Sequence, residues 1–140
     1  LLVLLQWPVG RALARRPVAQ GLGLSLVCFC VGTALLALSA LTEAGIGVVI
    51  VALVPLALGE AAFLPIATEA VVELTPVGHG GLAMALFSQC FAVSALVAPL
   101  VTGVLLDSQR NGLALWLLTA LGCATCLLLL PAISRRAHRA

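Results

Sequence analysis

The chain is 140 residues long, and 63% of its residues are hydrophobic while only 9% are charged. Soluble domains are roughly 45–50% apolar, so this composition excludes a soluble domain and indicates an integral membrane protein. The formal net charge of +2 and the lack of tyrosine leave no basic surface rich in aromatic residues, which excludes nucleic acid as a partner.

Long apolar stretches alternate with short polar segments, at lengths that fit membrane helices. A helix needs about 20 apolar residues to cross a bilayer, whereas a barrel strand needs about 10 residues of alternating polarity. We expect an all-α integral membrane unit over residues 1–140, with four complete spans at 21–41, 46–74, 82–106 and 113–131. A truncated helix end over Leu1–Trp7, without an initiating methionine, predicts that the chain is a fragment.

A basic loop follows the truncated helix end and carries Arg11, Arg15 and Arg16. One interpretation is a solvated cytoplasmic anchor, and the other is a loop that locks a gate. The next span, 21–41, carries small residues at spacings of four, three, four and seven, so that they share one face: Gly21, Ser25, Cys28, Gly32 and Ser39. Such a stripe predicts a close approach between two helix backbones.

The span 46–74 contains Pro55 and Pro65, with Glu60 between them near mid-membrane. Each proline removes an intrahelical hydrogen bond, which predicts a local break in the helix. An ionised carboxylate near the bilayer centre costs roughly 2.5 kcal/mol or more. We therefore expect Glu60 to be protonated for part of a transport cycle or to contact a cationic substrate. A structural glutamate, bonded to backbone that the prolines free, is the alternative.

Glu69 and Glu73 lie four residues apart near the end of the same span, hence on one face. Glu60 and Glu69 are nine residues apart, so a straight helix directs them to opposite sides. The pair is within reach of the basic loop and could close a cytoplasmic gate by pairing with Arg11, Arg15 or Arg16. The alternative is a solvated helix end.

The span 82–106 offers Gln89, which either faces a substrate pathway or hydrogen-bonds to a neighbouring helix. A second stripe of small residues includes a proline and predicts helix packing: Ser88, Ala92, Ala95, Pro99 and Gly103. Before this span, residues 75–81 form a turn rich in proline and glycine, with His79 exposed.

Five cysteines lie within the apolar spans, and Cys123 and Cys126 have CxxC spacing. A redox or metal pair is conceivable, but small packing residues are the favoured interpretation, and we expect no metal site. The sequence has no GxSxG, HExxH or Walker-type loop, so we expect no enzymatic activity.

The arginines predict the orientation. If each span crosses once, Arg110 alone lies on one side and six others lie on the opposite side: Arg11, Arg15, Arg16, Arg135, Arg136 and Arg139. Positive residues gather on the cytoplasmic side. We therefore expect a multi-pass protein of the plasma or inner membrane with a cytoplasmic C-terminus.

Three segments resemble the C-terminal half of a major facilitator superfamily transporter, from the end of helix 8 to the tail after helix 12. Gln6–Arg16 is similar to the cytoplasmic loop motif between helices 8 and 9. Leu58–Glu60, with Pro65 and Pro76–Gly80, resembles helix 10 and the turn into helix 11. Ala98–Gly103, ending at Asp107, is similar to the recurring GP-xx-GG pattern of helix 11. The subtype resembled most is a bacterial drug/proton antiporter.

The resemblance implies twelve helices in two halves that transport a small molecule by alternating access. It implies proton-coupled efflux of the multidrug type, driven by a proton gradient without a bound cofactor. The partners implied are the small-molecule substrate, membrane lipid and the missing N-terminal half of the same transporter. The alternative from another class is a self-contained four-helix membrane protein for interaction or assembly.

Overall fold

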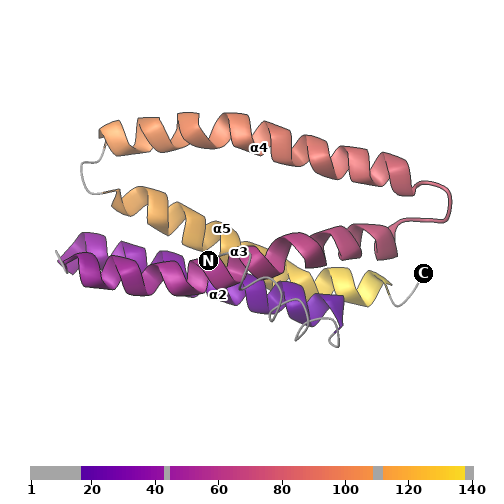
Figure 1. The fold of residues 1–140 in the computed structure, drawn as a ribbon, viewed down its shortest axis with the longest axis horizontal. Coiled ribbons are helices and arrows are strands. Elements are labelled where there is room, and N and C mark those ends of the chain that lie inside the picture. Colours follow the sequence, from indigo (N-terminus) through magenta and orange to yellow (C-terminus); the bar gives the residue numbers. More distant parts are fainter. Residues whose placement is uncertain (1–16, 43–44, 109–111, 138–140) are drawn as a thin grey trace.

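The computed structural model describes residues 17–42, 45–108 and 112–137, and it describes side chains as far as Pro131. The chain forms four α-helices: α2 over Val18–Thr42, α3 over Ile46–Leu74, α4 over Gly80–Ser108 and α5 over Leu113–Ala137 (Figure 1). These ranges contain no strand. All four helices are long and apolar enough to cross a membrane, α5 over Leu113–Pro131, which confirms the predicted fold class. The predicted helix end at Leu1–Trp7 lies outside the described residues.

Helices α2 and α3 pack closely and run antiparallel. Gly21 of α2 faces Ile66 of α3, while Gly32 lies farther along α2 and faces Leu56. A Cβ atom added to Gly32 would lie 2.5 Å from Cγ of Leu56 and 3.2 Å from the carbonyl oxygen of Ala52. No side chain fits between these backbones, so the predicted stripe of small residues on α2 is confirmed as a packing surface.

Polar side chains in this interface bond within their own helix. Ser25 is fully buried at 0% exposure, and its hydroxyl donates to the carbonyl of Leu22 at 2.9 Å. Thr33 is 2% exposed and donates to the carbonyl of Phe29 at 2.7 Å. Both hydroxyls are satisfied without a partner on another helix, which allows α3 to pack on them as it would on an apolar surface.

Phe29 of α2 and Phe63 of α3 form an edge-to-face pair across this interface, with ring centroids 6.2 Å apart at an interplanar angle of 72°. Such pairs contribute about 0.5–1.5 kcal/mol beyond the area they bury. We expect a double-mutant cycle of Phe29→Leu and Phe63→Leu to give a coupling energy in that range when detergent-solubilised protein is unfolded. A coupling energy near zero would contradict the pairing.

Helix α5 packs on α2, whereas α4 stands apart from the other helices (Figure 1). Gly23 of α2 lies against Leu130 of α5. No residue of α4 is buried, and a Cβ atom added to Gly103 would meet nothing within 4 Å among the atoms placed around it. The second stripe of small residues is therefore open along α4, and packing at Pro99 and Gly103 stays a prediction.

The prolines lie inside helices that continue past them. Pro55 and Pro65 lie within α3, and Pro99 lies within α4. Figure 1 shows the axis of α3 changing direction along its length. The predicted breaks therefore do not end either helix. Helix α3 ends at Leu74, where the predicted turn begins. Within this turn Gly78 has a φ of 93°, a conformation that favours glycine.

Candidate functional site

Glu60 occupies the middle of α3. It is the fifteenth of the 29 residues of this helix, so at 1.5 Å per residue it lies about 21 Å from either end. The hydrocarbon core of a bilayer is about 30 Å thick, which places this carboxyl group near the centre of the membrane. The side chain is exposed, although its neighbours Gly59 and Ala61 are buried.

Exposed apolar side chains lie before and after Glu60 on the same face of α3. Leu53, seven residues before it, is 53% exposed, and Leu64, four residues after it, is 48% exposed; these spacings place all three on one face. Glu60 makes no hydrogen bond or ion pair with another residue that the structure describes, including the backbone near Pro55 and Pro65. An ionised group here needs protein, water or a cation beside it.

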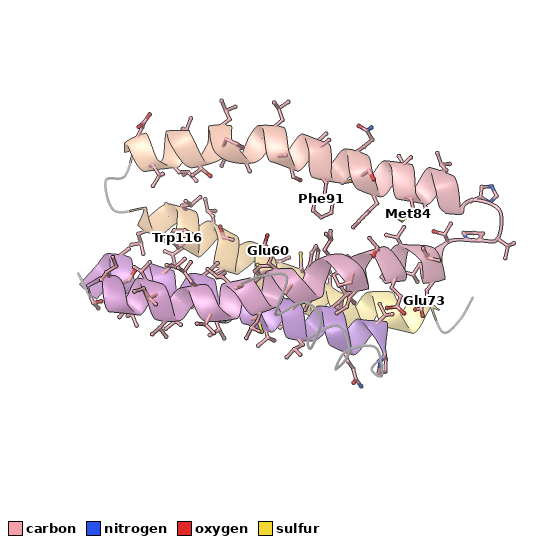
Figure 2. All side chains as sticks on the ribbon, viewed as in Figure 1. Glu60, Glu73, Met84, Phe91 and Trp116 are labelled. Carbon is pink, nitrogen blue, oxygen red and sulfur yellow. The ribbon has the colours of Figure 1, made fainter. Side chains whose placement is uncertain are left out.

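Glu69 and Glu73 form a second acidic site. Both side chains are exposed, and Glu73 is followed directly by Leu74, the last residue of α3. Figure 2 shows Glu60 and Glu73 projecting from opposite sides of α3. The two sites are therefore separate. Arg11, Arg15 and Arg16 lie outside the described residues, so the gate contact stays a prediction.

Gln89 lies on α4 and is exposed. Met84 and Phe91 point from α4 toward the side where α3 lies (Figure 2). Gln89 precedes Phe91 by two residues, a rotation of about 200° at 3.6 residues per turn, so it faces away from α3. The structure therefore does not bring Gln89 and Glu60 together, and the role of Gln89 in a pathway stays a prediction.

The α4 side chains that face α3 were missed by sequence reasoning, which followed polar residues alone. Phe91 stacks edge-to-face on Phe87 of the same helix, with centroids 5.1 Å apart. Met84 is half-buried and lies seven residues, about two turns, before Phe91. The seven-residue spacing of Met84 and Phe91 is the sequence feature that could have identified them, because it places both side chains on one face of the helix. Apolar and aromatic side chains of this kind line small-molecule sites in proteins.

The described ranges contain no group of three or more histidine, cysteine, aspartate or glutamate side chains that could hold a metal ion. Cys123 and Cys126 are free thiols, the first half-buried and the second exposed.

Comparison with known protein families gives a match over the whole chain. Residues 1–140, the whole chain, match the family described as Major Facilitator Superfamily. No curated protein and no solved structure matches significantly. The family consists of membrane transporters rather than enzymes, and four membrane-length helices fit a multi-pass protein of this kind. The chain therefore belongs to the Major Facilitator Superfamily and serves transport across a membrane.

Proposed function

We propose that this chain is the C-terminal part, from the end of helix 8 to the tail after helix 12, of a drug/proton antiporter that exports small molecules. The observation that carries the proposal is the Glu60 carboxyl group, exposed at the middle of a membrane-spanning helix on an apolar face. The proton gradient drives the cycle without a bound cofactor. The protein lies in the plasma or inner membrane with its C-terminus in the cytoplasm.

Glu60 couples proton entry to substrate export because its carboxyl group binds both the proton and the substrate. The neutral, protonated form suits the apolar face that Leu53 and Leu64 provide. Loss of the proton leaves a charge that is costly in hydrocarbon unless a cation approaches. A cationic substrate and a proton therefore compete for Glu60, and the site opens to one side of the membrane and then to the other with one or the other bound.

The rest of the pathway comes from the N-terminal half of the transporter, with lipid around the outside. This assignment is supported by α4, on which no residue is buried although Met84 and Phe91 face α3. A helix in a bundle packs against neighbours on more than one side. In this arrangement the open faces of α3 and α4 meet helices of the N-terminal half.

Transport by the full-length protein in everted membrane vesicles tests the proposal. Ethidium, a lipophilic cation, serves as the probe, and an imposed pH gradient serves as the driving force. We expect the vesicles to accumulate ethidium while their lumen is acidic and to release it when a protonophore is added. Accumulation that survives the protonophore and needs ATP or a sodium gradient would contradict proton coupling, and vesicles without the protein give the background.

The acidic pair at the end of α3 makes a separate prediction. We propose that Glu73, or Glu69 on the same face, pairs with the basic loop when the cytoplasmic side is closed. Glu73→Arg and Arg15→Glu should each slow ethidium efflux by placing like charges together, and the double variant should restore it. Arg11 and Arg16 are tested in the same way, as are the matching exchanges at Glu69. Failure of every exchange to restore efflux would rule out the gate.

A further inference from the structure

Helices α2 and α5 face each other in a definite antiparallel register. A Cβ atom added to Gly23 of α2 would lie 3.4 Å from Cδ2 of Leu130 on α5. Seven residues are about two helical turns. Moving seven residues forward along α2 reaches Cys30, and moving seven residues back along α5 reaches Cys123. The packing register alone therefore places these two cysteines opposite each other.

Two side-chain contacts agree with this register. The Cys30 thiol donates to the carbonyl of Ala120, with Sγ and O 4.0 Å apart, and Ala120 lies three residues, or nearly one turn, before Cys123. The Cys123 thiol also lies close enough to the Cys30 thiol to interact with it electrostatically. Both thiols are free and half-buried, so they meet inside the α2–α5 interface rather than on the outer surface.

The other three cysteines have different surroundings. Cys28 lies on the opposite interface of α2, where its Cβ atom packs near Gly59 of α3. Cys90 is exposed on α4, and Cys126 is exposed on α5 one turn beyond Cys123. The CxxC spacing therefore does not define the pair of interest. The pair consists of one thiol from α2 and one from α5, and the two cysteines are 93 residues apart in sequence (30 to 123).

We propose that Cys30 and Cys123 form a site of oxidative modification, at which a disulfide joins α2 to α5. Facing residues of two packed helices can bring Cβ atoms to the roughly 3.5–4.5 Å that a disulfide requires. Two S–H bonds break and one S–S bond forms. A membrane-permeant two-electron oxidant of the diazene or quinone class accepts both electrons and both protons, and becomes a hydrazine or a quinol.

The position of the pair determines which oxidants reach it. Cys30 lies within the span Val18–Thr42 and Cys123 within the span Leu113–Pro131. An oxidant must therefore enter the hydrocarbon region, and a charged, water-soluble oxidant is excluded by the cost of burying its charge. The proposal is independent of the transport mechanism and of the role of Glu60, because it rests on the α2–α5 contact alone.

Protease cleavage of the full-length protein in vesicles tests the cross-link. A cleavage site is inserted in the turn at residues 76–79, where Val77 is fully exposed, so that cleavage separates α2 from α5. The vesicles are treated with diamide, a diazene, then with N-ethylmaleimide to block free thiols, and are then cleaved. We expect the two fragments to stay joined on a non-reducing gel, to separate after reduction, and to yield a Cys30–Cys123 peptide by mass spectrometry.

Matched variants identify the pair. Cys30→Ser and Cys123→Ser should each give separate fragments, whereas Cys28→Ser, Cys90→Ser and Cys126→Ser should leave them joined. Alanine replacements at Cys30 and Cys123 check that the serine hydroxyl group is not the cause of fragment separation. Separate fragments from the oxidised parent protein would overturn the proposal, as would fragments that stay joined when either Cys30 or Cys123 is missing. The peptide from the parent protein decides the question even if a variant does not insert.

Discussion

Glu60→Gln in the full-length transporter is expected to reduce ethidium efflux from energised cells to the level of cells without the transporter. Glutamine keeps the shape and hydrogen-bonding capacity of the protonated side chain but neither releases a proton nor carries a charge. Glu60 is exposed at the midpoint of α3 between the exposed side chains of Leu53 and Leu64, so no structural partner in the described chain is lost. The expected defect is therefore in coupling rather than in folding.

Two further variants separate the carboxyl group from its surroundings. Glu60→Asp keeps an ionisable group on a shorter side chain and should retain measurable efflux. Val51→Gln adds the same amide to an exposed position on the opposite face of α3, nine residues before Glu60. This variant leaves Glu60, Leu53 and Leu64 in place, and it should transport nearly as the parent does. If Glu60→Gln exports ethidium at the parent rate, with equal amounts of protein in the membrane, the functional role of Glu60 is contradicted.

Gly32→Ala is expected to produce the largest loss of stability among alanine replacements of the three α2 glycines, Gly21, Gly23 and Gly32. The new Cβ atom would lie 2.5 Å and 2.8 Å from two atoms of the Leu56 side chain. It would also lie 3.2 Å from the backbone oxygen of Ala52, which cannot rotate away. Overpacking of this kind costs about 1–3 kcal/mol. Unfolding of the detergent-solubilised protein measures the change.

A control and a rescue make the packing test specific. Gly103→Ala adds the same methyl group to α4 where nothing lies within 4 Å. It should leave the free energy of unfolding unchanged or raise it by up to about 1 kcal/mol, because alanine has the higher helix propensity. Leu56→Ala should recover part of the loss in the Gly32→Ala background, because it removes the side-chain atoms that clash. Equal effects at Gly32 and Gly103 would show that helix propensity, not the α2–α3 contact, determines the result.

Sequence reasoning predicted the helices and one interface well. The span predicted at 46–74 coincides with α3, and the other helices extend beyond the predicted spans by a few residues at most of their ends. These results follow from hydropathy, which sets the length of a span. Gly21, Ser25 and Gly32 were found because their spacing is local to one helix, and the structure buries all three.

The relations between helices were beyond prediction from the sequence. The contact of Cys30 with Ala120 depends on the α2–α5 register, which no periodicity within either helix specifies. The direction of Gln89 depends in the same way on where α3 lies relative to α4. Polar character singled out Gln89, but Met84 and Phe91 are the labelled α4 side chains that face α3. The placement of Glu60 at mid-span was predictable, because position along a helix is counted directly from the sequence.

The central claim is that Glu60 binds a proton and the cationic substrate in turn, and proteoliposomes test it most directly. Three rates are measured on one preparation: ethidium accumulation driven by a pH gradient, proton movement when ethidium is added, and exchange of ethidium across the membrane at equal pH. For Glu60→Gln we predict that gradient-driven accumulation of ethidium is lost and that adding ethidium moves no protons. Both losses are predicted even where ethidium exchange at equal pH continues. Gradient-driven accumulation with proton movement at the parent rate in Glu60→Gln would contradict the account.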